Sequence, residues 1–259
     1  MEITELFCRI DDSTQSFLTD ISQKTIGKIK RNSRLSLSEI ITILIYFQIS
    51  SYRDFKDYYI KHVSVFLRKE FPNLVSYNRF VELIPTAILP MFYYLQKYNE
   101  NEKTGIYYID STTLKVCDNH RIHSHKVFKG LAKRGKSSMG WFFGFKLHIV
   151  CNEKGQIMSF MLSNGAKSDQ NIDIVTTLCK GLVGKLFGDK GYISSYLFET
   201  LINKGLHLIT KIQNNMKNKL MQISDKLLLR KRAIIESIND QQKNIFVLEH
   251  SRYRSPVNL

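Results

Sequence analysis

The stretch Ile106-Tyr107-Tyr108-Ile109-Asp110 decides how the second half of this chain folds. Its four apolar or aromatic residues favour a short β-strand, and that strand leads directly into a carboxylate. The same arrangement recurs at Lys185-Leu186-Phe187-Gly188, which is followed at once by Asp189. A carboxylate at the end of a buried strand is costly unless a positive charge pairs with it, and a divalent cation is an efficient partner. The two stretches therefore predict acidic side chains presented from two strand ends.

Strand and helix patterns alternate around these two stretches. Asn152-Glu153-Lys154-Gly155 predicts the turn of a hairpin, because glycine adopts the positive φ that such a turn needs. The elements expected in chain order are strands at 106–109, 142–151 and 156–162, a helix at 172–182, a strand at 185–188, a helix at 195–203, a strand at 207–210 and a helix at 226–243. This order predicts an α/β fold with a mixed sheet.

Residues 1–100 predict a small all-helical domain, separate from the α/β domain expected over residues 101–259. Apolar side chains recur at three- and four-residue steps over 35–45, and Ser36 with Glu39 fits a capping box at the start of that helix. Further helices, broken where proline lacks a backbone donor, are expected at 52–67, 77–84 and 89–98, with the breaks at Pro72, Pro85 and Pro90. Short consecutive helices fit a helix-turn-helix DNA reader, and they fit a small packing domain equally well.

The composition is that of a folded globular protein. Apolar residues make up 43% and charged residues 24% of the 259 residues. Apolar runs such as Ile43-Leu44-Ile45-Tyr46-Phe47 are far shorter than the roughly 18 residues of a membrane span. The acidic start Met1-Glu2-Ile3-Thr4-Glu5 has the wrong charge for a signal peptide, so we expect the protein in the cytoplasm. The four cysteines lie far apart, without the paired spacing of a zinc site or a disulfide framework.

Positive charge is concentrated in the second half. The formal net charge is +15. Residues 1–100 hold 13 basic and 11 acidic side chains, a net of +2, whereas residues 101–259 hold 25 and 12, a net of +13. Such a field attracts polyanions, of which nucleic acid is the commonest. The alternative is a basic surface that binds no nucleic acid.

Glu236 supplies a third acid, on the last expected helix. At about 100° per residue, Arg232, Glu236 and Lys243 fall within roughly 40° of one another around that helix. Such a face suits phosphodiester chemistry, because two divalent cations can activate a water or a 3′-hydroxyl while Arg and Lys hold the phosphates. Each acid also has a purely structural interpretation, in which Asp110 caps a turn, Asp189 starts one and Glu236 pairs with Arg232.

Residues 120–136 are expected to form a mobile basic loop. Lys133, Arg134 and Lys136 would contact the DNA backbone without reading its sequence. Trp141 follows at the start of a strand, where its ring either stacks on an unpaired base or packs in the core. The same loop contains an H-x-x-H-x-H cluster, formed by His120, His123 and His125. Its alternative interpretation is a zinc site.

Three motifs resemble the DDE motifs of bacterial insertion-sequence transposases. They are Tyr107-Tyr108-Ile109-Asp110-Ser111-Thr112, Phe187-Gly188-Asp189-Lys190-Gly191-Tyr192 and Arg232-Ala233-Ile234-Ile235-Glu236. The chain most resembles the insertion sequence 982 family, and the stretch Lys231 to Ser255, including Glu249-His250-Ser251-Arg252, strengthens this match. The resemblance implies an RNase H-like catalytic core after the helical domain. It implies a transposase that cleaves phosphodiesters at the ends of its element and joins them to target DNA.

Position by position, the resemblance implies that Asp110, Asp189 and Glu236 bind catalytic Mg²⁺ or Mn²⁺. Arg232 and Lys243 match the Arg and Lys of a Tyr-Arg-Glu-Lys signature in related transposases, which implies contacts with DNA. Leu229 stands where that signature has tyrosine, so the tyrosine's contact is not expected here. The implied partner is double-stranded DNA, as terminal inverted repeats and as target, bound by a homo-oligomer. The implied location is the bacterial cytoplasm, at the nucleoid and not at a membrane.

Two other functions stay open. Members of the family continue beyond Leu259 into a further hydrophobic segment, so one alternative is a truncated DNA-binding remnant without catalysis. The other is a metal-dependent nuclease that only hydrolyses. Missing metal dependence would favour the remnant, and missing strand joining would favour the nuclease.

Overall fold

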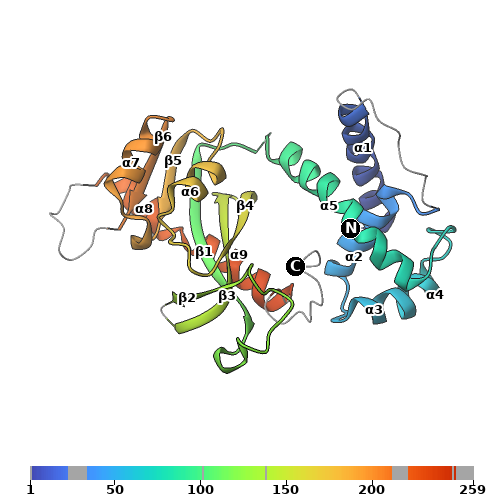
Figure 1. Ribbon diagram of the computed structural model, residues 1–259. Helices are drawn as coiled ribbons and strands as arrows, with labels where there is room; N and C mark the ends of the chain where they lie inside the picture. The colour runs from blue at the N-terminus through green and yellow to red at the C-terminus, as the bar shows by residue number, and fades with distance from the viewer. Residues whose placement is uncertain are drawn as a thin grey trace. The chain divides into compact units, whose positions relative to one another are not determined.

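The computed structural model describes residues 2–22, 34–100, 102–137, 139–211, 221–246 and 248. The chain divides into two compact units, Met1–Tyr98 and Asn99–Leu259 (Figure 1). Among the described residues, no helix combines the length and the apolar character needed to cross a lipid bilayer. The stretch 249–255, part of the resemblance above, lies outside the described residues.

The first unit is built from helices throughout its described part. They are α1 (Ile3–Ser22), α2 (Leu37–Ile49), α3 (Phe55–Tyr58), a π-helical turn η1 (Tyr59–Val63), α4 (Ser64–Phe66) and α5 (Tyr77–Glu100), which ends just past the unit boundary. The predicted capping box is confirmed: Ser36 Oγ accepts from the Glu39 amide at 3.1 Å, and Glu39 Oε2 accepts from the Ser36 amide at 2.6 Å. This exchange satisfies two amides at the start of α2 that the helix itself leaves without a partner.

The predicted breaks at Pro85 and Pro90 are wrong, because α5 runs through both prolines. Each proline removes one backbone hydrogen bond from the helix interior. Phe80, Leu83 and Ala87 lie on this helix and are buried in the core of the unit. Burial of that apolar stripe outweighs the lost hydrogen bonds, which is the usual source of helix stability in a folded domain.

The second unit is organised around one six-stranded sheet (Figure 1). Its strands are β1 (Ile106–Cys117), β2 (Lys133–Ser137), β3 (Gly140–Asn152), β4 (Ile157–Asn164), β5 (Gly184–Gly188) and β6 (Leu206–Thr210). The order is β2-β3-β1-β5-β6, with β4 also paired to β3. β1, β3 and β4 pair antiparallel, whereas β5 pairs parallel to β1 and β6 parallel to β5. The predicted hairpin is confirmed by β3 and β4, with Gly155 at φ 84° in the turn.

β1 is longer than predicted. The pattern predicted a strand that ends at Asp110, but β1 continues to Cys117. The extension follows from pairing, because β3 runs alongside β1 from Tyr107 to Cys117. The parallel pairing between β1 and β5 reaches only Tyr108, so it stops close to Asp110, where the strand was predicted to end. Asp110 therefore lies within a strand, beside the point where its parallel neighbour ends.

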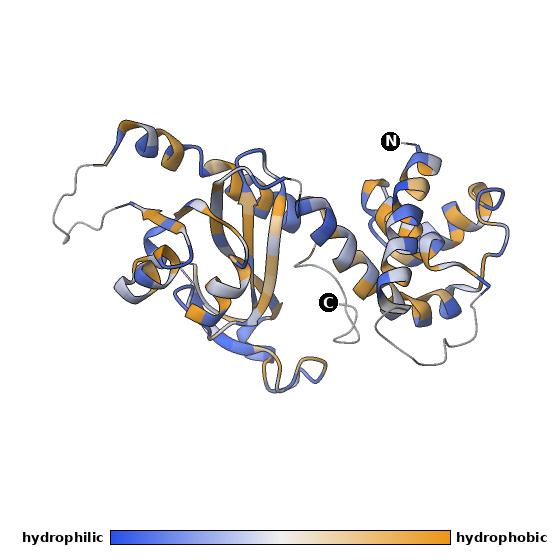
Figure 2. Cartoon of the chain, turned by 90° about the horizontal axis from the view of Figure 1, so that it is seen from above, coloured by the Kyte–Doolittle hydropathy of each residue, from blue (hydrophilic) through white to orange (hydrophobic). Residues whose placement is uncertain are grey.

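Helices cover both faces of the sheet. They are α6 (Ile172–Leu178), α7 (Ser195–Ile202), α8 (Ile223–Arg230) and α9 (Ala233–Asp240), with short turns η2 (Asn119–Arg121), η3 (Lys190–Tyr192) and η4 (Gln241–Ile245). Tyr107 and Ile109 of β1 pack in one core with α6 and α7, whereas Tyr108 and Leu114 pack in another with α9. Side chains alternate between faces along a strand, so the two cores lie on opposite sides of the sheet. Figure 2 shows hydrophobic residues along the central strands between them.

The single helix predicted at 226–243 is wrong. α8 ends at Arg230 and α9 begins at Ala233, with a tight turn at Lys231 and Arg232 between them. Leu229 and Ile235 are both buried in the same core cluster. On a straight helix, residues six positions apart would point about 120° away from each other. The turn brings both side chains onto the sheet.

Candidate active site

Asp110 and Asp189 occupy matching positions on two neighbouring parallel segments, Asp110 within β1 and Asp189 directly after β5. Tyr108 pairs with Phe187, and each aspartate stands two residues further along its own strand. Tyr108 and Phe187 are buried in the core that faces α9. Because side chains two residues apart share a face of a sheet, both aspartates start from the α9 side.

Gly188 keeps these two strands close. A Cβ at Gly188 would lie 3.2 Å from Ile109 Cγ2 and 3.2 Å from Tyr192 Cδ2. Ile109 directly precedes Asp110, and Tyr192 belongs to the η3 turn that Asp189 begins. A side chain at position 188 would therefore push apart the segments that carry the two carboxylates.

The Asp110 carboxylate is held by α9. Asn239 Nδ2 donates to Asp110 Oδ2 at 3.0 Å, and Arg232 Nη1 lies 3.8 Å from Asp110 Oδ1. Burial raises the pKa of Asp110 to about 6, Arg232 opposes this shift, and the negative charges of Asp189 and Glu236 add to it. Asp189 and Glu236 are thus close enough to Asp110 to influence it electrostatically.

Arg232 links two of these acids. Its Nη2 donates to Glu236 Oε1 at 2.7 Å, while its Nη1 faces Asp110. The Arg232 side chain is 15% exposed and that of Glu236 is 57% exposed. The ion pair between Glu236 and Arg232, which was the structural interpretation of Glu236, is therefore present. Lys243 lies two turns further on, in η4, and is partly buried.

The donor chemistry of the three acids fits a hard divalent cation, for which carboxylate oxygens are the usual ligands. The raised pKa of Asp110 fits as well, because a cation beside it would relieve the repulsion from the other two acids. The side chains do not converge as a finished ligand set, however. Within the described ranges, no group of three or more His, Cys, Asp or Glu is arranged to hold a metal ion. The histidines for which zinc binding was the alternative interpretation, His120, His123 and His125, form no such group either. Instead, His125 Nε2 accepts a hydrogen bond of 3.3 Å from the Phe128 amide.

The predicted mobile basic loop is in part a strand. Lys133, Arg134 and Lys136 belong to β2, which pairs with β3. Phe128 and Ala132 before it are buried in the core that faces α9. These two residues anchor the segment, and the sequence pattern did not reveal them because each belongs to an apolar pair, Val127-Phe128 and Leu131-Ala132, too short to show a helix or strand period.

Trp141 is exposed, so the expectation that its ring packs in the core is wrong. It lies on β3 opposite Lys136 and is 56% exposed. The Arg134 guanidinium and the Lys136 ammonium lie 5.4 Å and 5.9 Å from its ring centre. β2 and the start of β3 therefore carry an aromatic ring flanked by cations.

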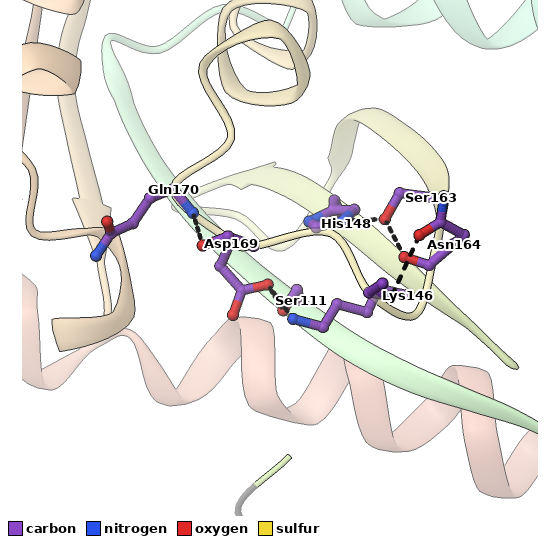
Figure 3. Close-up of polar contacts among 9 residues, drawn as sticks. Ser111, Lys146, His148, Ser163, Asn164, Asp169 and Gln170 are labelled. Atoms are coloured by element: carbon purple, nitrogen blue, oxygen red, sulfur yellow. Dashed lines mark hydrogen bonds and ion pairs between the residues drawn. The ribbon is translucent and has the colours of Figure 1, made fainter. Parts of the chain in front are cut away.

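A polar cluster that the sequence motifs did not predict lies on the other face of β1. Ser111 Oγ and Lys146 Nζ both donate to Asp169 Oδ1, at 2.7 Å and 3.0 Å (Figure 3). His148 is fully buried next to them, shares a hydrogen bond of 2.8 Å with Ser163 Oγ, and has a pKa lowered by burial to about 4. A signal was present, because Lys146 and His148 alternate with the apolar residues Phe145, Leu147 and Ile149.

Asn239 was also missed. It lies three residues after Glu236 on α9, and its contact with Asp110 joins positions 129 residues apart. Asparagine carries no charge and belongs to none of the quoted motifs, so only the packing of α9 on β1 reveals its role.

Comparison with known proteins gives two results. A family model described as a transposase DDE domain matches residues 100–256. Among solved structures, a piggyBac transposase in a synaptic complex with hairpin DNA is 13% identical with a TM-score of 0.38, and the match covers 83% of this chain and 50% of that one. The chain therefore spans about half the length of that transposase. A search of curated proteins found no match.

Proposed function

Because the chain belongs to the family of transposase DDE domains, whose model matches residues 100–256, we propose that it cleaves DNA at the ends of a mobile element and joins those ends to target DNA. Asp110, Asp189 and Glu236 are the proposed ligands of Mg²⁺ or Mn²⁺. The observation that carries the proposal is the register of β1 and β5, in which Asp110 lies two residues after Tyr108 and Asp189 two residues after its partner Phe187, directly beyond the end of β5. The finer assignment to the insertion sequence 982 family is part of the same proposal.

The proposed fold of the second unit is RNase H-like. Three antiparallel strands continue into two parallel strands, and helices lie on both faces. This arrangement supports the proposal, because it puts the ends of adjacent parallel strands beside one another. Ligand and catalytic groups in α/β folds gather at such positions.

Bound divalent cations would activate a water or a 3′-hydroxyl and stabilise the leaving oxygen. Asp110 and Asp189 present oxygen ligands from the two strands. Asn239 holds Asp110 Oδ2, so one oxygen of that carboxylate has a fixed direction. The Asn239 amide thereby orients the acid that the sheet itself positions.

Arg232 and Glu236 are proposed to separate when the site is loaded. Glu236 is 57% exposed, so its carboxylate can turn away from Arg232 without opening the core. The guanidinium of Arg232 is then free to make charge-assisted hydrogen bonds to a DNA phosphate. Lys243, further along the same region, is proposed to add a second phosphate contact.

We propose that β2 and the start of β3 form a DNA-binding ribbon. Lys133, Arg134 and Lys136 supply positive charge, which binds phosphates regardless of sequence. The exposed ring of Trp141 provides a surface on which an unpaired base can stack. The helices of the first unit would help to recognise the terminal inverted repeats. The acting form would be a homo-oligomer on DNA in the bacterial cytoplasm.

The test is cleavage and joining of a DNA that carries the element's own ends, with Mg²⁺ or Mn²⁺, by the unaltered chain and by Asp189→Ala. We expect both activities in the unaltered chain and neither in the variant. Asp173→Ala is the matched control, because Asp173 is an exposed acid in the first turn of α6. Binding without metal-dependent cleavage by the unaltered chain would indicate the DNA-binding remnant instead. Cleavage without joining would indicate the nuclease.

A further inference from the structure

Lys146 places an ammonium group inside the second unit. The residue is 9% exposed and projects from β3 on the face opposite Asp110. Its register partner is Thr113, and His148, two residues further along β3, is paired with Ser111. A buried ammonium is costly without a counter-charge. The carboxylate of Asp169, 3.0 Å away, is that counter-charge.

Asp169 does more than neutralise Lys146. Its Oδ1 also accepts a hydrogen bond of 2.7 Å from Ser111 Oγ, and Ser111 directly follows Asp110 on β1 (Figure 3). The carboxylate comes from the turn between β4 and α6, 58 residues away from Ser111. One oxygen of Asp169 is therefore tied to β1 and β3 at the same time.

The other oxygen of Asp169 faces the segment that carries Asp189. A Cβ built at Gly191 would lie 3.9 Å from Asp169 Oδ2, so the gap between this oxygen and the η3 turn is about the size of one methyl group. Tyr192, the next residue of that turn, is 2% exposed and packs in the core with Ile109. Asp169 thus bonds to the residue after Asp110 and lies beside the turn after Asp189.

We propose that Asp169 is a positioning residue that sets the separation between Asp110 and Asp189. Its carboxylate fixes β1 through Ser111 and supports the η3 turn near Gly191. Lys146 holds that carboxylate in place through the ion pair. The role rests on the function proposed above, because it presupposes that Asp110 and Asp189 bind metal together.

A purely structural role, the neutralisation of Lys146, is separated from positioning by two double variants. Lys146→Met/Asp169→Ala removes the ion pair and the hydrogen-bond acceptor of Ser111. Lys146→Met/Asp169→Asn removes the same two charges, but its amide oxygen still accepts from Ser111. Neither variant leaves a buried charge without a partner, so both are expected to fold.

The measurement is Mn²⁺ binding to the full-length chain without DNA, followed by the electron paramagnetic resonance of free Mn²⁺. We expect Lys146→Met/Asp169→Ala to bind Mn²⁺ about tenfold more weakly than the unaltered chain, the upper end of the effect of one hydrogen bond. Lys146→Met/Asp169→Asn should bind within about twofold, because the acceptor is restored. Equal affinity of both variants and the unaltered chain would overturn the positioning role.

Two serine variants give the same test with the ion pair intact. Ser111→Ala removes only the hydroxyl that donates to Asp169, and we expect its Mn²⁺ affinity to fall about threefold. Ser163→Ala is the control, because Ser163 contacts His148 on the same sheet face and has no contact with Asp169 among the bonds described. If Ser111→Ala binds Mn²⁺ as Ser163→Ala does, the proposal is wrong even if a double variant does not fold.

Asp189→Ala separates this proposal from the function on which it rests. If Asp189→Ala binds Mn²⁺ as tightly as the unaltered chain, the proposed metal site is wrong and the role of Asp169 fails with it. If Asp189→Ala loses Mn²⁺ binding while Lys146→Met/Asp169→Ala keeps it, the metal site stands and only the positioning role is wrong.

Discussion

Asn239 Nδ2 donates a hydrogen bond of 3.0 Å to Asp110 Oδ2, so an uncharged side chain of α9 orients the carboxylate that β1 carries. Asn239 is 8% exposed, and Asp110 has a side-chain exposure of 22%. In so little solvent, a hydrogen-bond donor has a larger effect on the direction of a carboxylate than it would at the surface.

Asn239→Ala removes this donor and leaves Asp110 Oδ2 without it. We expect kcat for DNA cleavage to fall about tenfold with KM for DNA unchanged, because Asn239 contacts the acid and not the DNA; the free energy of unfolding should fall by about 1 kcal/mol. Steady-state kinetics and urea unfolding measure the two effects. Asn244→Ala, which removes an exposed bond to Asp240, is the control. Cleavage by the two variants at the same rate would contradict the prediction.

The pKa of Asp110 predicts how the stability of the metal-free protein changes with pH. Burial raises this pKa from 3.8 to about 6. An acid with a raised folded pKa binds its proton more tightly in the folded state. The stability that the protonated Asp110 side chain contributes to the folded state is therefore full below pH 3.8 and is lost as the pH rises through about 6. The shift corresponds to about 3 kcal/mol.

Urea unfolding from pH 4 to pH 8, with a metal chelator present, measures this contribution. Between these limits, the unaltered chain should lose about 3 kcal/mol relative to Asp110→Asn, which has no proton to release at this position. Other titrating groups cancel in the difference. Asp173→Asn should run parallel to the unaltered chain. A parallel profile for Asp110→Asn would show that Asp110 does not titrate in this range.

Gly188→Ala should separate the segments that carry Asp110 and Asp189. The added Cβ would lie 3.2 Å from Ile109 and from Tyr192, both buried, so the free energy of unfolding should fall by about 1–3 kcal/mol. Mn²⁺ affinity should fall as well. Gly191→Ala is the matched control, because its Cβ would meet only Asp169 within 4 Å, at an ordinary 3.9 Å. Thermal unfolding measures the stability of both variants, and Mn²⁺ titration measures their affinity for the metal. Equal stability and equal affinity of the two variants would contradict the close approach of the two segments at Gly188.

Trp141→Ala should weaken binding of single-stranded DNA without loss of stability. The ring is 56% exposed, so its removal opens no cavity. Loss of one stacking surface should raise Kd about tenfold, and Trp141→Phe should restore most of the affinity. Fluorescence anisotropy with a labelled oligonucleotide measures Kd, and the melting temperature checks the fold. An unchanged Kd for Trp141→Ala would exclude stacking on this ring.

Some features followed from local sequence. The capping box at Ser36, the hairpin turn at Gly155 and the strand before Asp189 each depend on residues a few positions apart, and each is present. The predicted extents of α5, β1 and α9 were wrong where packing overruled the local pattern. α5 passes through Pro85 because its apolar stripe is buried, and β1 continues past Asp110 because β3 pairs with it.

The sequence by itself determined which acids are the candidate metal ligands, because Asp110, Asp189 and Glu236 each stand in a recognisable local pattern. Only the tertiary structure decided what holds them. Asn239 reaches Asp110 across 129 residues, and Asp169 reaches Ser111 across 58. Periodicity along a chain reports which face of its own element a side chain occupies. It does not report which other element packs against that face, and this packing places the Asn239 amide beside Asp110 and the Asp169 carboxylate beside Ser111.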